Sequence, residues 1–95
     1  MFSTIMNLVY KALSDPTRRK ILELLRKQDM TAGELADHFD LAKPTLSRHF
    51  SVLKEADLIR GDKDGTTITY RLNTSVLEEA LLALMNAFHI TKEGE

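Results

Sequence analysis

Apolar residues recur with helical spacing in four segments between residues 3 and 57. The first segment, residues 3–13, is apolar over a wide arc and predicts a helix. The second helix starts at Asp15 and Pro16, because Asp is a favoured N-cap and proline is tolerated in the first turn. A third and a fourth helix are predicted from Thr31 and from Pro44.

The third and fourth helices are joined by a short polar turn. Thr31 and Glu34 have the spacing of a capping box, which marks the start of the third helix. The fourth helix repeats apolar residues at i, i+4 and i+7, which predicts one buried face: Leu46, Phe50 and Leu53. Two short amphipathic helices around a tight turn are typical of a helix-turn-helix, which we predict over residues 31–57.

A strand pattern follows this unit and predicts a hairpin with strands at 58–62 and 66–72. Asp64 and Gly65 between them are a strong turn signal, because the turn requires positive φ. A hairpin directly after a helix-turn-helix is a wing, and we predict it over residues 58–72.

The last predicted helix covers residues 75–90, and Ser75 and Glu78 have the spacing of a second capping box. It is apolar over more than half of its circumference, whereas a surface helix of a monomer needs a stripe of only ~100°. We therefore expect a homodimer built on the helices at 3–13 and 75–90. Its predicted interface residues are Ile5, Leu8, Val9, Leu77, Leu81, Leu84 and Phe88. The alternative is that the last helix only covers the core.

The 95 residues form a single predicted domain, mainly α with a small β-hairpin, of the winged helix-turn-helix class. The chain has no cysteine, which excludes a disulfide framework and any thiolate metal site. No apolar run approaches the ~20 residues of a membrane span. The apolar N-terminal segment lacks the basic region and cleavage site of a signal peptide. We expect a cytoplasmic protein.

The charge is unevenly distributed, although the formal net charge is only −1. Residues 18–27 contain five basic residues and one acidic residue, Glu23. Residues 74–95 contain four acidic residues and one basic residue, Lys92. A basic front and an acidic back would orient the molecule on a polyanion, and the low total predicts modest, salt-sensitive binding.

The polar face of the fourth helix points to the kind of polyanion. It carries Pro44, Ser47, Arg48 and Ser51, opposite the apolar residues. Short polar side chains beside one long fork-shaped donor suit a helix that lies close to DNA base edges. The pattern predicts a DNA-binding protein.

Four stretches carry a family resemblance: ALSDPTRRKILELL at 12–25, TAGELADHF at 31–39, KPTLSRHFSVLKEADLI at 43–59 and DGTTITYRLN at 64–73. They extend from residue 12 to residue 73 in the family's order. The chain resembles the ArsR-type winged-helix repressors of bacteria and is most similar to the small autorepressors among them. The resemblance implies a dimer with the fourth helix in the major groove and the wing over adjacent phosphates or the minor groove. The operator is then an inverted repeat in double-stranded DNA.

The resemblance assigns DNA contacts to five positions in the fourth helix: Lys43, Thr45, Ser47, Arg48 and His49. For His49, packing is an equal alternative to a phosphate contact. Lys63 and Arg71 in the hairpin are candidate phosphate contacts, and an ordinary solvated hairpin is the alternative. Arg18 lies at the edge of the apolar side of the second helix, where a structural pairing and a phosphate contact are both open.

Two residues depart from the family's pattern at the ends of the fourth helix. Ala42 stands where a capping Ser or Thr is common, and Asp57 stands where Gly often ends the helix. The wing tip around Lys63 also carries less positive charge than is usual in the family.

Many members of the family are metal sensors, so the positions of their ligands matter. The thiolate positions fall on Ala36 and His38, which cannot form a thiolate site. The zinc positions in the last helix offer few suitable ligands: Val76, Glu78, His89 and Glu93. One imidazole and scattered carboxylates do not enclose a zinc ion, so no metal and no other cofactor is expected. Neighbouring Ser and His residues in the fourth helix lack an orienting acid, so an enzyme is not expected.

These observations favour a dimeric transcriptional repressor that acts on its own promoter without a metal sensor. Its release is expected from a sequestering protein partner at the membrane, and no small-molecule substrate is implied. Two alternatives stay open: a winged-helix module that binds another protein, and a metal-responsive repressor with a non-thiolate site.

Overall fold

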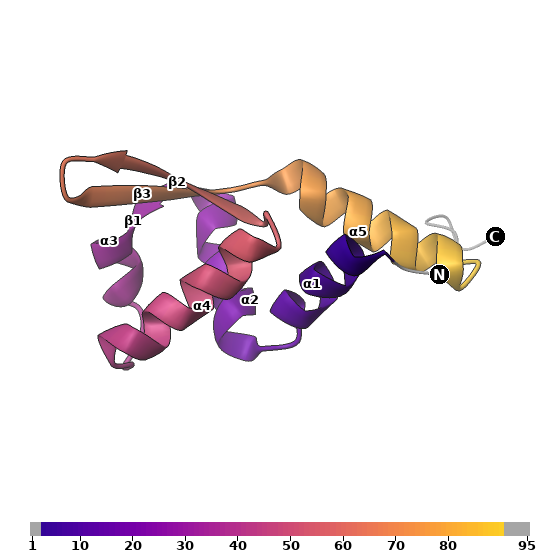
Figure 1. Ribbon diagram of the computed structural model, residues 1–95, viewed down its shortest axis with the longest axis horizontal. Helices are drawn as coiled ribbons and strands as arrows, with labels where there is room; N and C mark the ends of the chain where they lie inside the picture. The colour runs from indigo at the N-terminus through magenta and orange to yellow at the C-terminus, as the bar shows by residue number, and fades with distance from the viewer. Residues whose placement is uncertain (1–2, 91–95) are drawn as a thin grey trace.

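The computed structural model describes residues 3–90 of the chain. Its elements follow the order α1 (Thr4–Leu13), α2 (Pro16–Lys27), β1 (Met30–Thr31), α3 (Ala32–Ala36), α4 (Lys43–Glu55), β2 (Ile59–Asp64), β3 (Thr67–Leu72) and α5 (Thr74–Ala87). The predicted fold class is confirmed, because a helix-turn-helix is followed directly by a hairpin and a last helix (Figure 1).

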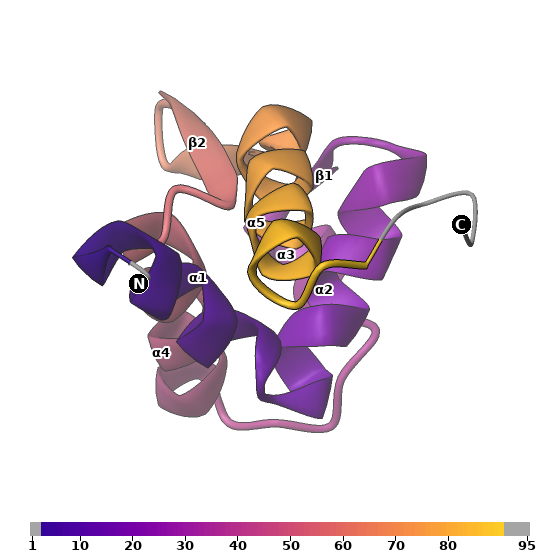
Figure 2. The ribbon, with the colours of Figure 1, turned by 90° about the vertical axis from the view of Figure 1, so that its right-hand side faces the viewer.

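The molecule is elongated, with extents of 47 × 24 × 23 Å. The hairpin of β2 and β3 projects at one end, and α5 runs to the other end (Figure 1). Seen along the long axis, α5 runs between α1 on one side and α2 on the other (Figure 2). The Tyr10 hydroxyl of α1 donates to the carbonyl oxygen of Ala80 in α5 at 2.9 Å. The tip of the wing and the far end of α5 therefore lie at opposite ends of the molecule (Figure 1).

One apolar core holds the elements together, and all five helices and all three strands contribute to it. Its large, fully buried side chains are Val9, Ile21, Leu35, Leu53, Leu58 and Ile59. The predicted buried face of α4 is confirmed, since Leu46, Phe50 and Leu53 are all buried. The rings of Phe50 and Tyr70 lie 4.9 Å apart, which joins α4 to the wing.

The sheet has three antiparallel strands in the order β1-β3-β2. β1 pairs Met30 with Tyr70 and was not predicted, because two residues are too few to show alternation. Asp64 pairs with Thr67, so the turn consists of Gly65 and the residue after it. Gly65 has φ 65° in the first turn position, as in a type II′ turn. The predicted turn of Lys63, Asp64 and Gly65 is therefore wrong, because Lys63 and Asp64 belong to β2.

The N-cap residues of α3 and α4 are those that the sequence predicts. The Thr31 side chain accepts from the Glu34 amide at 3.1 Å, and the Glu34 carboxylate accepts from the Thr31 amide at 2.9 Å. This reciprocal pair is the predicted capping box. Ala42 is the N-cap of α4 and provides no side-chain hydrogen bond, as its methyl group dictates.

The C-terminus of α4 closes without glycine. Asp57 has φ 59°, in the left-handed region where glycine is usual. Its amide donates to the Lys54 carbonyl at 2.9 Å, and the Leu58 amide donates to the Leu53 carbonyl at 3.0 Å. These two hydrogen bonds form a Schellman motif. Asp57 therefore adopts the C-cap geometry that glycine usually provides in the family.

Both ends of α5 differ from the prediction. The helix starts one residue early with Asn73 as N-cap and no side-chain cap, so the expected Ser75–Glu78 capping box is wrong. The Asn73 amide group instead donates to the Asp57 carbonyl at 3.0 Å. α5 ends at Ala87, and His89, with φ 56°, lies beyond it rather than on its polar face.

Candidate nucleic-acid interface

The outer face of α4 is exposed and carries no carboxylate before Glu55. Among the predicted DNA contacts, Lys43, Ser47 and Arg48 are exposed, and Thr45 is half-buried. Arg48 lies between small side chains on this face, because Ser47 and Ser51 are also exposed. The polar face that the periodicity assigned to α4 is therefore open to a partner.

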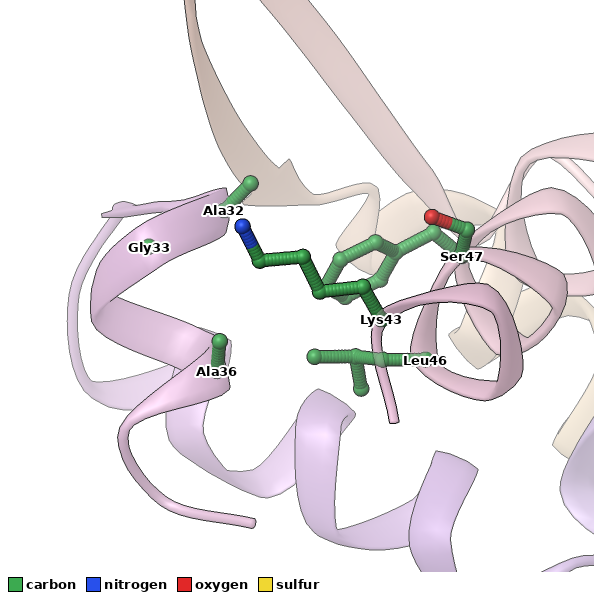
Figure 3. A pocket seen from close by; sticks show the side chains of 7 residues that line it. Ala32, Gly33, Ala36, Lys43, Leu46 and Ser47 are labelled. Carbon is green, nitrogen blue, oxygen red and sulfur yellow. The ribbon is translucent and has the colours of Figure 1, made fainter. Parts of the chain in front are cut away.

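A recess of about 270 Å³ separates α3 from α4 beside this face. Its walls are small or apolar: Ala32, Gly33, Ala36, Leu46 and Phe50. The Lys43 side chain extends across the recess from α4 toward Ala32, and Ser47 lies at its rim (Figure 3). Because no bulky residue of α3 covers them, Lys43 and Ser47 lie at the mouth of the groove between the two helices of the helix-turn-helix.

His49 turns away from this face toward the start of α2. Its side chain is only 15% exposed, with Nδ1 3.8 Å from the Asp15 carboxylate. The same nitrogen lies 3.1 Å from Nη1 of Arg18. The structure therefore packs His49 against α2 and gives Arg18 the structural pairing that the sequence left open.

Asp15 carries the negative charge of this cluster. Its burial raises the pKa of the carboxyl group, but the hydrogen bonds from the Arg18 and Thr17 amides and the charge of Arg18 outweigh that effect. The pKa of Asp15 consequently lies below its ordinary value. The same carboxylate is the N-cap of α2, so charge and capping act together here.

The structure does not bring the two predicted wing residues together. Lys63 pairs with Ile68, on the face that also carries the buried Tyr70. Arg71 pairs with Arg60, and successive residues of a strand point to opposite faces. Lys63 and Arg71 are both exposed but lie on opposite faces of the hairpin.

Arg60 is a candidate that the sequence reading missed. It faces Arg71 directly across the hairpin, and like charges opposite each other destabilise a sheet unless an anion lies nearby. Asp57 offsets part of this repulsion through an exposed ion pair of 3.5 Å with Arg60. Arg60 pairs with Arg71 because the turn has two residues. The strand ends predicted from the sequence imply a longer turn and therefore a different pairing.

The chain is similar to known proteins over most of its length. The model of the family described as "Bacterial regulatory protein, arsR family" matches residues 15–60. The transcriptional repressor SdpR of Bacillus subtilis (strain 168) is 51% identical over 81 residues, which are 85% of this chain and 90% of SdpR. The chain belongs to the ArsR family.

Two further comparisons agree with this membership. The arsenical resistance operon repressor of Staphylococcus aureus is 37% identical over 73 residues, covering 77% of this chain and 70% of that protein. A crystal structure of an ArsR family transcriptional regulator matches with a TM-score of 0.81 at 32% identity, covering 93% of each chain. The protein is therefore a DNA-binding transcriptional repressor of the ArsR family, and its relatives are regulators rather than enzymes.

The residues expected at an ArsR dimer interface divide into three groups. Ile5, Leu81 and Phe88 are exposed, and Leu8, Leu77 and Leu84 are half-buried. Val9 is 0% exposed because it packs in the core of its own chain, so its assignment to the interface is wrong. Leu82 and Ile90 are also exposed. We call Ile5, Leu81, Leu82, Phe88 and Ile90 the apolar patch.

The family's metal positions have no cluster of ligands in the part of the chain that the structure describes. Within residues 3–90, no three His, Asp or Glu side chains lie close enough to hold a metal ion. His89 is exposed beyond α5, and Glu93 lies outside the described residues. None of the helices within residues 3–90 has the length and apolar character needed to cross a bilayer.

Proposed function

We propose that this ArsR family member is a homodimer that represses its own promoter by binding an inverted-repeat operator through α4. The observation that carries the proposal is the exposed, acid-free face of α4 with Arg48 between Ser47 and Ser51. Small neighbours let the helix enter the major groove deeply. A guanidinium can then donate two parallel hydrogen bonds to guanine O6 and N7.

The test compares Arg48→Ala, Arg48→Lys and Lys63→Ala on operator and scrambled DNA over a range of salt concentrations. Arg48→Ala should weaken specific binding by about 1–3 kcal/mol and relax the preference at one base pair per half-site. Arg48→Lys keeps the charge but loses the bidentate geometry, so it should lose specificity while its salt slope stays the same.

Lys63→Ala should instead weaken binding to every sequence similarly and lower the salt slope by about one. If Arg48→Ala weakens operator and scrambled DNA equally, the residue contacts phosphate and the proposed base readout is wrong. A wild-type salt slope near zero would favour a module that binds another protein.

We propose that the dimer forms through the apolar patch of α1 and α5. The α5 helix runs to the end of the molecule opposite the wing tip (Figure 1), so a partner subunit bound to that end would leave both copies of α4 uncovered. In a two-fold dimer each subunit reads one half-site, which places the half-site centres about one DNA turn, or a small multiple, apart. Selection of bound fragments from genomic DNA gives this spacing and shows whether the protein's own promoter is bound.

We further propose that regulation does not use a metal and that a sequestering protein partner at the membrane relieves repression. The similarity to SdpR and the resemblance to small autorepressors support this proposal. Zn(II) at low micromolar concentration should leave operator affinity within about a factor of two, well below usual allosteric coupling. A loss of affinity with zinc that His89→Ala abolishes would restore a metal-sensing function.

A further inference from the structure

The Arg18 side chain connects three helices. Its Nε donates to the Ala12 carbonyl at 2.8 Å, and its Nη2 donates to the Lys11 carbonyl at 3.0 Å. Both carbonyls belong to the last turn of α1, where carbonyl groups carry partial negative charge, and the Lys11 carbonyl also accepts from the amide and hydroxyl of Ser14. With two nitrogens held on α1, the guanidinium presents Nη1 to His49 of α4 at 3.1 Å.

This contact determines which nitrogen of His49 carries the proton. A guanidinium has only N–H donors and stays protonated, so Nδ1 of His49 must accept the hydrogen bond. A neutral imidazole that accepts at Nδ1 carries its proton on Nε2. The Asp15 oxygen is 3.8 Å from Nδ1, too far for a competing hydrogen bond, and it already accepts from the Arg18 amide at 3.1 Å.

The Nε2 atom reaches the surface. In the part of the chain that the structure describes, no solvent-shielded side-chain nitrogen or oxygen of a buried or half-buried residue lacks a hydrogen-bond partner. The interactions of His49 with residues 3–90 involve only Nδ1. Because Nε2 has no partner among these residues, it must be accessible to solvent. His49 follows Arg48 directly on α4, at the flank of the face proposed to enter the groove. Phosphates line the flanks of a groove that a helix occupies.

We propose that Arg18 is a positioning residue for DNA binding. It holds the His49 imidazole in the tautomer with the proton on Nε2, and that N–H donates to a backbone phosphate of the operator. The DNA part of this inference rests on the proposed function, because it requires α4 to lie in the major groove. The tautomer part concerns the protein without DNA and can be tested separately.

The first experiment measures the tautomer in DNA-free protein. Long-range ¹H–¹⁵N spectra at about pH 8, where an ordinary imidazole is neutral, distinguish a protonated from an unprotonated ring nitrogen. The His49 signals are assigned by their absence in His49→Asn. The proposal expects an unprotonated Nδ1 and a protonated Nε2 in the wild type, and a mixture of tautomers in Arg18→Lys. A protonated Nδ1, or a mixture in the wild type, would overturn it.

The second experiment separates the two ring nitrogens with a matched pair of variants. In His49→Asn the amide oxygen replaces the Nδ1 acceptor for Arg18, whereas in His49→Gln the amide nitrogen replaces the Nε2–H donor. His49→Asn should bind operator and scrambled DNA about two- to tenfold more weakly than the wild type, the worth of one hydrogen bond. Its salt slope should not change, because the lost donor is neutral. His49→Gln should bind more tightly than His49→Asn, and wild-type affinity for His49→Asn would contradict the phosphate contact.

The third experiment asks whether Arg18 acts through His49. Arg18→Lys keeps the charge but cannot make all three contacts of the guanidinium. It should weaken DNA binding in the wild type and have no further effect in His49→Asn. An equal loss in both backgrounds would mean that Arg18 only supports the fold, contrary to the proposal. If Arg18→Lys does not fold, the wild-type tautomer and the Asn and Gln pair still decide.

Discussion

Truncation of Leu81 tests the proposed dimer with little disturbance of the single chain. Leu81 lies on α5 and is 46% exposed, and it does not belong to the buried core. Leucine and alanine both have high helix propensity, so Leu81→Ala should leave α5 intact. Its effect should therefore appear in association rather than in folding.

The expected magnitude follows from the exposed fraction. Full burial of a leucine side chain contributes about 1.5–3 kcal/mol. Close to half of the Leu81 surface is available for burial against a partner, which gives roughly 0.7–1.4 kcal/mol per subunit. Two-fold symmetry counts the contact twice, so the dissociation constant of the dimer should rise about ten- to a hundredfold. Leu81→Glu would bury a carboxylate in the same place and should prevent association at micromolar concentration.

Sedimentation equilibrium over a range of protein concentrations measures the dissociation constant, and circular dichroism confirms that each variant is folded. Leu41→Ala is the matched control, because Leu41 is 40% exposed but lies between α3 and α4, away from the apolar patch. The reasoning fails if both Leu81 variants dimerise like the wild type, or if Leu41→Ala weakens the dimer as strongly as Leu81→Ala.

Three further predictions concern stability. A Cβ at position 61 would lie 3.0 Å from Cε1 of Tyr70, so Gly61→Ala should lower the free energy of unfolding by about 1–3 kcal/mol in urea titrations. Asp57 has φ 59°, so Asp57→Val should be less stable than Asp57→Gly by about 1–2 kcal/mol, and equal stability would contradict the strained C-cap. The pKa of Asp15 is lowered on folding, so its carboxylate stabilises the protein above the unfolded pKa, about 3.9, and this contribution is lost as pH falls through the lower folded value. Asp15→Asn retains a capping side chain, so thermal melts should show it less stable than the wild type at pH 7, with the difference disappearing at strongly acidic pH.

Most of the helical framework was predictable because its signals are local. The spacing of Leu46, Phe50 and Leu53 identified both the buried side of α4 and the opposite face with Arg48. The capping box at Thr31 was also predictable, because its hydrogen bonds join residues only three positions apart. An interaction between residues within one turn of a helix can be predicted from their spacing in the sequence.

The errors occurred where a longer-range partner decides the geometry. β1 exists because Met30 pairs with Tyr70, and the sequence of a two-residue strand does not indicate which residue it will pair with. Val9 has the same apolar character as the exposed Ile5, and only the packing of the chain separates a core residue from a surface one. The turn has two residues rather than the predicted three, so that Arg60 lies opposite Arg71 and Lys63 lies on the other face of the hairpin.

The sequence by itself determined the winged helix-turn-helix class, the exposed polar face of α4 and the apolar character of α5, because periodicity and capping depend on residues that are close in the chain. It left His49 open between a phosphate contact and packing. Only the tertiary structure brings Arg18, 31 positions earlier in the chain, to Nδ1 of His49, and so makes this nitrogen a hydrogen-bond acceptor. A tautomer depends on which donor lies within hydrogen-bond distance, and that distance is set by how α1, α2 and α4 pack together.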